Sequence, residues 1–177
     1  MNPDIQRGLV GKPLPLNNAG ITEDMVTTMM SEADWDTSAH LKSMVSCSEA
    51  AIRHMVRKNT GRIVNLNMTS MAGWLGDPFQ TNYCASKDGQ IAYTKALAPQ
   101  VTACNITVNA VTPGFVDKEF LSDTSPATLE AVLRVASLAR KGTPEEIAYA
   151  VAFLASDPAA FLTGQVLGQD GGMAMMM

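Results

Sequence analysis

The stretches RIVNL at residues 62–66 and ITVNAV at residues 106–111 decide the fold of this 177-residue chain. Both are short and rich in isoleucine or valine, which is typical of strands buried on both faces of a parallel sheet. Between them the pattern predicts a helix over residues 81–103, although Pro99 should end or kink it. A strand, a long helix and a second strand form a βαβ unit. The sequence therefore predicts an α/β fold with a parallel sheet.

Helices are also expected on both sides of this unit. One is predicted over residues 32–58 and another over residues 143–156. The latter begins with Thr143 as N-cap, Pro144 in the first helical position and Glu146 as capping-box partner. The buried face of the earlier helix is expected to contain Trp35, Leu41, Val45, Ala51, Ile52 and Met55. A basic cluster, interpreted as the solvated end of this helix, consists of Arg53, His54, Arg57, Lys58 and Arg62.

Two shorter segments are candidates for the outer strands of the sheet. Val166–Leu167 lies inside a glycine-rich stretch, and residues 14–17 lead into the sequence NNAG. Pro13 and Pro15 argue against a central position for residues 14–17, because proline cannot donate a hydrogen bond to the ladder. If these residues form a strand, we expect it at an edge of the sheet or distorted.

The composition limits the class of protein. Hydrophobic residues make up 46% of the chain and charged residues 17%, which suits a single folded domain over residues 1–177. The formal charge of −4 gives no reason to expect nucleic acid or a membrane as partner. Three cysteines and two histidines favour neither a disulfide framework nor a metal site. Without a signal peptide or an apolar run of roughly 18 residues, we expect a cytoplasmic protein.

Ser70, Tyr83 and Lys87 form a candidate catalytic group within TSMAGWLGDPFQTNYCASK, residues 69–87. Tyr83 and Lys87 are four residues apart, so their side chains share one face of a helix. A tyrosine hydroxyl has a pKa of about 10, and an ammonium held beside it would lower that pKa. Ser70 follows a predicted strand, and ligands bind at the carboxyl ends of strands in open α/β sheets. The group suits a tyrosine that protonates a carbonyl gaining a hydride.

Taken alone, these three residues are weak support for a catalytic site. Average residue usage places Y-x-x-x-K by chance in about a third of chains of this length, and the added serine lowers this to roughly a few per cent. The alternative interpretation is a surface lysine, a packed tyrosine and a loop serine. The rest of the sequence decides between the two.

Five stretches occur in the order and spacing of one known family. They are NNAGIT (17–22), GRIVN (61–65), Ser70 with YCASK (83–87), ITVNAVTPGF (106–115), and GTPEEIAYAVAFLASDPAAFLTGQ with DGG (142–172). On these stretches the chain resembles the short-chain dehydrogenase/reductase family, in particular its 3-oxoacyl-acyl-carrier-protein reductases. The resemblance implies a partial Rossmann-type, doubly wound parallel sheet, made of roughly the last four strands with their flanking helices.

The resemblance implies a role for each candidate catalytic residue. Tyr83 matches the family's general acid/base, and Lys87 matches the lysine that lowers the pKa of that tyrosine and hydrogen-bonds the nicotinamide ribose. Ser70 matches the serine that orients the substrate carbonyl. His40 stands where the family usually has a fourth catalytic residue, an asparagine, and an ordinary helix histidine is at least as good an interpretation as a relay role.

The resemblance also implies a cofactor, NADP or NAD, with NADP favoured. The residues that match cofactor-contacting positions are Asn18, Ala19, Gly20, Tyr83, Lys87, Pro113, Gly114 and Val116. Among them, Pro113 and Gly114 correspond to a turn that faces the nicotinamide, and Val116 to a backbone contact with its carboxamide. A small-molecule or acyl-carrier-bound substrate and a homo-oligomer, either a dimer or a tetramer, are implied as partners.

Some features depart from the family pattern. Asp88, directly beside Lys87, stands where alanine is usual, and Lys118 replaces a threonine that commonly helps to hold the cofactor. Nothing before residue 14 matches the family's glycine-rich strand–turn–helix, which binds the pyrophosphate. We therefore expect a truncated domain that lacks the glycine-rich βαβ units, and the choice between NAD and NADP stays open.

Two functions are compatible with these observations. The first is an NAD(P)H-dependent reductase of a 3-oxoacyl thioester or related ketone, which works through Ser70, Tyr83 and Lys87. The alternative is a catalytically inactive remnant or gene fragment of this family, at most a subunit-contact protein.

Overall fold

A computed structural model describes residues 13–18, 27–32, 35, 40–66, 81–117, 130 and 133–174. The elements, in chain order, are β1 (Leu16–Asn17), η1 (Thr27–Met29), α3 (His40–Lys58), β2 (Gly61–Leu66), α5 (Thr81–Val101), η2 (Thr102–Cys104), β3 (Ile106–Pro113), α7 (Pro144–Ala155), η4 (Asp157–Ala159) and β4 (Val166–Gln169). From β2 to β4, each strand is connected to the next through an α-helix, as the sequence predicts.

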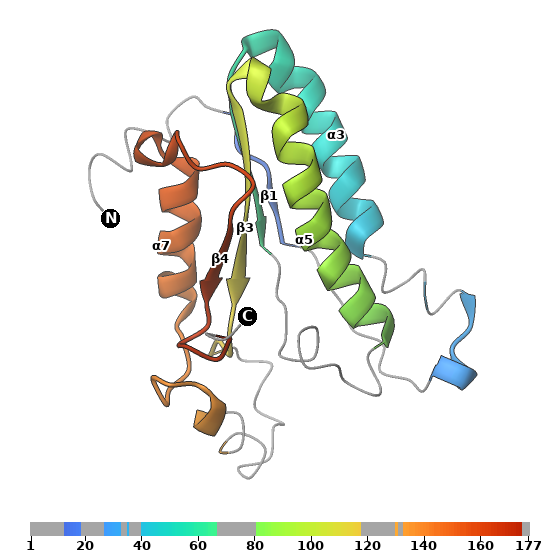
Figure 1. Ribbon diagram of the computed structural model, residues 1–177, viewed down its shortest axis with the longest axis vertical. Coiled ribbons are helices and arrows are strands. Elements are labelled where there is room, and N and C mark those ends of the chain that lie inside the picture. The colour runs from blue at the N-terminus through green and yellow to red at the C-terminus, as the bar shows by residue number, and fades with distance from the viewer. Residues whose placement is uncertain are drawn as a thin grey trace.

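The four strands form one parallel sheet in the order β1-β2-β3-β4. β2 and β3 pair continuously from Gly61↔Ile106 to Leu66↔Val111. Helices α3 and α5 cover one face of the sheet and α7 covers the other (Figure 1). The predicted α/β fold with a parallel sheet is therefore confirmed.

β1 lies at one end of the described sheet, as its two prolines predict. The carbonyl oxygen of Pro13 accepts a hydrogen bond from the N–H of Arg62, and that of Pro15 accepts one from Val64, each at 3.3 Å. Proline lacks an N–H but keeps its C=O. Both prolines therefore pair with β2 through the one backbone group that they can offer.

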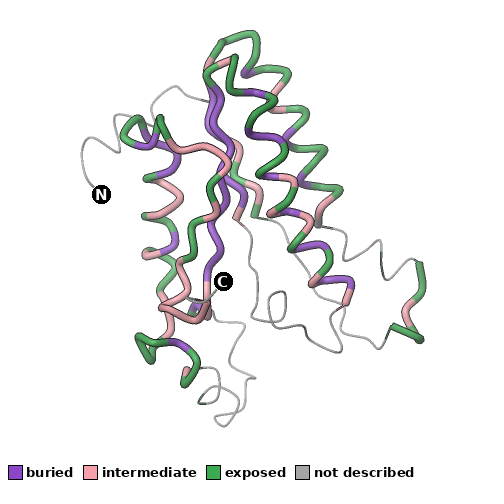
Figure 2. The backbone as a smooth tube through the Cα atoms, in the orientation of Figure 1, coloured by how far each residue is buried: buried purple, intermediate pink, exposed green. Residues whose placement is uncertain are grey.

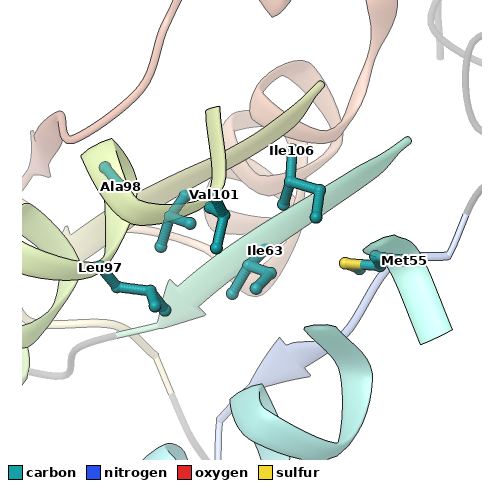
Figure 3. Close-up of a cluster of buried hydrophobic side chains, with 7 residues drawn as sticks. Met55, Ile63, Leu97, Ala98, Val101 and Ile106 are labelled. Carbon is teal, nitrogen blue, oxygen red and sulfur yellow. The ribbon is translucent and has the colours of Figure 1, made fainter. Parts of the chain in front are cut away.

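Alternate residues of β2 and β3 contribute to two hydrophobic clusters. The cluster toward α3 and α5 consists of Met55, Ile63, Leu97, Ala98, Val101, Ile106 and Val108 (Figure 3). The cluster toward α7 consists of Val64, Val111, Val116, Ile147, Leu154 and Ala155. Ile63 and Val64 are neighbours in β2 but join different clusters, because successive side chains of a strand point to opposite faces. The two central strands are accordingly buried along nearly their whole length (Figure 2).

The buried face predicted for residues 32–58 is wrong at two positions. Trp35 and Val45, both expected inside, are 45% and 36% exposed. Met44 and Ser48 are buried instead, together with Met55. Positions four and seven residues apart share one face of a helix, so 44, 48 and 55 align. The hydrophobic pattern missed Ser48 because it is polar, yet its hydroxyl has a hydrogen-bond partner inside.

Arg62 also differs from its prediction as part of a solvated basic cluster. It lies in β2, and only 8% of its side chain is exposed. Its Nη1 donates a hydrogen bond to the carbonyl oxygen of Gly61 at 2.9 Å, and its Nη2 lies 3.6 Å from a carboxylate oxygen of Asp157. Position in a central strand, rather than proximity in sequence to the other cations, decides its burial.

The end of α5 departs from the local signal expected at Pro99, whereas the start of α7 follows its signal. α5 continues two residues past Pro99 to Val101, and the 3-10 turn η2 follows. At the start of α7 the predicted capping box is present, because Glu146 N–H donates to Thr143 Oγ1 and Thr143 N–H donates to Glu146 Oε2. Across the described part of the chain, no helix is both long and apolar enough to cross a membrane.

Candidate active site

The N-terminal half of α5 extends past the carboxyl ends of β1 and β2 (Figure 1). One hydrogen bond fixes the height of α5 relative to the strands. Asn65, the second-last residue of β2, donates from its Nδ2 to Thr94 Oγ1 at 2.8 Å, so Thr94 lies level with the end of β2. A helix rises about 1.5 Å per residue, so Lys87 lies roughly 10 Å and Tyr83 roughly 16 Å from the level of Thr94, toward the start of the helix. These two residues therefore lie at the carboxyl edge of the sheet.

Tyr83 and Lys87 are buried side by side on one face of α5. Tyr83 is 8% exposed and Lys87 only 2%. The Nζ of Lys87 lies 5.2 Å from the centroid of the Tyr83 ring. A cation within about 6 Å of a ring centroid is attracted to the aromatic face, and lysine is almost never so deeply buried without such partners. The two side chains therefore form one buried unit.

The buried face of α5 is polar through its first two thirds, from Asn82 to Thr94. The buried residues there are Asn82, Tyr83, Ser86, Lys87, Gln90 and Thr94. Positions 83, 87, 90 and 94 follow helical spacing and form one stripe toward the protein interior. Sequence reasoning missed Gln90 and Thr94 because polar helix residues are ordinarily assigned to solvent. Their spacing from Tyr83 is the signal that could have found them.

A buried hydrogen-bond network connects this stripe to the sheet and to α3. Asn17 Nδ2 donates to Asn65 Oδ1 at 2.8 Å and to Ser48 Oγ at 3.2 Å, and Asn65 donates onward to Thr94. The Ser48 side chain also hydrogen-bonds Tyr93; burial raises the pKa of Tyr93, and this hydrogen bond partly opposes the rise. Because Asn65 contacts both β1 and α5, the network sets the position of α5 on the sheet.

Gly114 follows β3 directly and contacts the backbone after β4. A Cβ at this position would lie 2.6 Å from the Asp170 Cα. The N–H of Gly114 donates to the Gln169 carbonyl oxygen at 3.1 Å. The Asp170 carboxylate in turn accepts hydrogen bonds from the N–H groups of Gly172 and Ala174. The absence of a side chain at Gly114 therefore lets the two turns at the carboxyl edge lie in contact.

Val116 forms an isolated parallel bridge with Gly142. The C=O of Phe115 accepts a hydrogen bond from the Gly142 N–H, and the N–H of Asp117 donates to the Gly142 carbonyl oxygen, both at 2.9 Å. A trans peptide directs its C=O and N–H in opposite directions, so the N–H and C=O of Val116 itself point away from Gly142. Val116 thus presents one donor and one acceptor beside the carboxyl end of β3.

The remaining sequence-predicted residues fall in different places. Ser70, Ala19, Gly20 and Lys118 lie outside the described residues. His40 begins α3, and its side chain is not described. Asn18 follows β1 and is exposed, as is Asp88 on α5, whereas Pro113 ends β3 and is buried. Among the side chains that the structure does describe, no three His, Cys, Asp or Glu residues lie where they could share a metal ion.

The fold and the site together define a class of protein. It is an open α/β protein with a parallel sheet, in which α5 carries a buried tyrosine–lysine pair and the segment after β3 presents a backbone donor and acceptor at Val116. The family model described as enoyl-(acyl carrier protein) reductase matches residues 14–174. The chain belongs to the short-chain dehydrogenase/reductase family, whose members are NAD(P)-dependent oxidoreductases, and is similar to its 3-oxoacyl-acyl-carrier-protein reductases.

Curated relatives match almost the whole chain. Nodulation protein G of Rhizobium meliloti (strain 1021) is 42% identical over 170 residues, which cover 95% of this chain and 69% of that protein. The 3-oxoacyl-acyl-carrier-protein reductase FabG of Chlamydia muridarum is 44% identical over 161 residues, covering 90% of this chain and 64% of that reductase. The FabG of Thermotoga maritima is 41% identical, with 90% and 65% covered. The chain thus spans about two thirds of the length of these relatives.

Proposed function

We propose that this protein reduces the keto group of a 3-oxoacyl thioester or a related ketone with NADPH or NADH, using Ser70, Tyr83 and Lys87. The observation that carries the proposal is the burial of Lys87, at 2% exposure, with its Nζ 5.2 Å from the centroid of the Tyr83 ring. A buried ammonium favours negative charge on a neighbouring oxygen. The pair therefore suits a tyrosine that gives up its proton during the reaction.

Each catalytic residue has one task in the proposed reaction. The Tyr83 hydroxyl donates its proton to the substrate carbonyl oxygen, and Lys87 stabilises the phenolate that this leaves. Ser70 donates a hydrogen bond to the same carbonyl oxygen and orients it. The cofactor, when bound, would supply a hydride to the carbonyl carbon, and the ketone would become a secondary alcohol. A proton relay through His40 would return the proton to Tyr83.

The residues at the carboxyl edge fit the nicotinamide end of the cofactor. A carboxamide carries one acceptor oxygen and an N–H₂ donor, which match the N–H and C=O of Val116. Pro113 and Gly114 would lie against the nicotinamide ring, and Lys87 would hydrogen-bond its ribose. The further contacts would come from Asn18, Ala19 and Gly20. NADP is the favoured cofactor because the chain is similar to 3-oxoacyl-acyl-carrier-protein reductases.

The relatives also support a proposal for substrate and assembly. Because the similar proteins are named as reductases of 3-oxoacyl groups on an acyl-carrier protein, we expect an acyl-carrier-bound or small thioester substrate. We further propose a homo-oligomer, a dimer or a tetramer, which size-exclusion chromatography with light scattering would measure.

Substitution of Tyr83 tests the catalytic proposal. Tyr83→Phe removes only the hydroxyl, and we expect it to lower the rate of reduction by at least about 100-fold, since general acid catalysis contributes at least that much. The measurement is the oxidation of NADPH or NADH with acetoacetyl-coenzyme A, a soluble 3-oxoacyl thioester. Tyr149→Phe is the matched control, because Tyr149 is 54% exposed on α7 and should leave the rate unchanged. An unchanged rate in Tyr83→Phe would refute the role of Tyr83.

Cofactor binding separates the reductase from an inactive member of the family. Asp88 favours the second candidate, because it places an acidic residue directly after Lys87. Titration of the unmodified protein with NADPH and with NADH, followed by the fluorescence of the reduced nicotinamide, measures both affinities. Micromolar binding would exclude the inactive alternative, and no binding at millimolar cofactor would exclude catalysis by this chain.

A further inference from the structure

Residues 140–142, which we call the strap, connect the start of α7 to the segment that follows β3. On one side, the Arg140 guanidinium donates two hydrogen bonds to the Glu146 carboxylate, at 2.9 and 2.6 Å. On the other side, Lys141 Nζ donates to Asp117 Oδ1 at 3.1 Å. Two consecutive cations therefore attach the strap to two different parts of the fold.

The ion pair between Lys141 and Asp117 lies immediately beside the bridge between Val116 and Gly142. Each partner of the pair adjoins a bridge residue, and the Asp117 N–H is itself one of the two bridge donors. The Lys141 side chain is 28% exposed and that of Asp117 is 67% exposed. Residues 116–117 and 141–142 are thus joined twice, by the side-chain ion pair and by the backbone bridge.

We infer that Asp117 and Lys141 are positioning residues for the nicotinamide carboxamide, and that they act through Val116. This inference rests on the proposed function, in which the Val116 N–H and C=O bind the carboxamide. Two hydrogen bonds to one small group require both backbone groups to keep their directions. Those directions depend on the bridge, because the peptides on either side of Val116 are the ones that bond Gly142. The ion pair therefore controls the affinity of the protein for the cofactor, although neither of its side chains contacts the cofactor.

Charge reversal tests the inference in the chain of 177 residues. We expect Asp117→Lys and Lys141→Asp each to weaken NADPH binding roughly two- to fivefold, the range for a partly exposed ion pair. The double reversal, D117K with K141D, should restore the wild-type affinity because the pair forms again with opposite polarity. E130K with R134E is the matched control: it reverses the exposed Glu130–Arg134 ion pair, whose residues lie outside the strap, and should change nothing.

An altered cofactor distinguishes positioning from a general structural effect. In the 3-acetylpyridine analogue of NADPH, a methyl ketone replaces the carboxamide, so this group can accept a hydrogen bond but cannot donate one. We expect the single reversals to lose less affinity for the analogue than for NADPH, as measured by calorimetric titration. A merely structural role would reduce both affinities equally. Amide hydrogen exchange at Asp117 and Gly142 should also accelerate in the single reversals and return to normal in the double.

The binding measurements distinguish failure of this inference from failure of the proposed function. If the unmodified protein binds NADPH but the single reversals bind it equally well, the inference is overturned and the proposed function stands. The same conclusion follows if the double reversal stays as weak as the singles, or if NADPH and its analogue lose affinity equally. If the unmodified protein binds neither NADPH nor NADH, the proposed function fails, and this inference fails with it.

Discussion

Gly114 is the residue at the carboxyl edge with the least room for a side chain. Its Cβ would lie 2.6 Å from the Asp170 Cα and 2.8 Å from the Asp170 carbonyl oxygen. The obstacle is backbone, which cannot rotate aside as a flexible side chain could. Any substitution must therefore push apart the turns that follow β3 and β4.

We expect Gly114→Ala to lower the free energy of unfolding by about 1–3 kcal/mol, the usual cost of overpacking. Chemical denaturation followed by circular dichroism measures the change. Gly168→Ala is the control in the adjacent strand, because a Cβ there would lie 3.8 Å from its nearest neighbour, Thr112 Oγ1. The control should stay within about 0.5 kcal/mol of the wild type. Equal effects of the two substitutions would contradict the close contact at Gly114.

At the scale of elements, the start of α7 is held by charge as well as by its cap. The pKa of Glu146 is lowered to about 2, chiefly by the hydrogen bonds from Arg140 and then by the backbone N–H of Thr143. Because the folded protein holds this carboxyl at a pKa below its ordinary value of 4.5, the ionised form stabilises the fold. That contribution is complete above pH 4.5 and is lost as the pH falls toward 2.

Glu146→Gln should therefore make the protein less stable at neutral pH and should flatten the decrease of its melting temperature below pH 4.5. The measurement is thermal unfolding at a series of pH values from neutral downward. Glu145→Gln removes the same charge one residue earlier, from outside the capping box, and should keep the wild-type slope. If Glu146→Gln keeps that slope as well, Glu146 does not contribute to the pH dependence.

Across the whole molecule, Asn65 connects the layers. Its side chain is completely buried, accepts a hydrogen bond from Asn17 in β1 and donates one to Thr94 in α5. Removing it would take one hydrogen-bond partner from the half-buried Asn17 amide and one from the buried Thr94 hydroxyl. The same bonds set the level of α5, and with it the level of Tyr83 and Lys87.

We expect Asn65→Ala to lower the free energy of unfolding by about 1–3 kcal/mol, the cost of leaving a buried polar group unsatisfied. Gln100→Ala is the control, because Gln100 is exposed and its side chain donates to the Ala96 carbonyl oxygen in the same helix, so its loss should cost less than about 0.5 kcal/mol. Urea denaturation measures the free energy of unfolding of both variants. A loss in Asn65→Ala no larger than in the control would show that the network adds no stability.

Local signals predicted much of the fold. Isoleucine and valine in RIVNL and ITVNAV indicated the central strands, the prolines around β1 indicated an edge, and Thr143 with Glu146 indicated the start of α7. These signals work because each depends on neighbours in sequence: the pleat, a missing N–H, a cap. Burial was predicted less well. Trp35 was expected inside and is exposed, whereas Arg62 was expected in solvent and is buried.

The candidate site was predictable in part, for the same reason. The spacing of Tyr83 and Lys87 is local, so their shared helix face followed from four-residue separation. Gln90 and Thr94 were missed because a buried polar residue needs a partner from a distant strand, which no local pattern reports. The pairing of Asp117 with Lys141 crosses 24 residues and could be found only in three dimensions.

By itself, the sequence determined the kind of elements, their order, the parallel sheet and the family. All of these follow from hydrophobic period, caps and motifs, which are carried by short stretches of chain. Only the tertiary structure decided that Lys87 is buried against Tyr83, that Asn65 sets the level of α5, and that Val116 turns its N–H and C=O away from Gly142. These depend on which distant groups meet in a packed interior, because there a polar group is kept only where another segment supplies its partner.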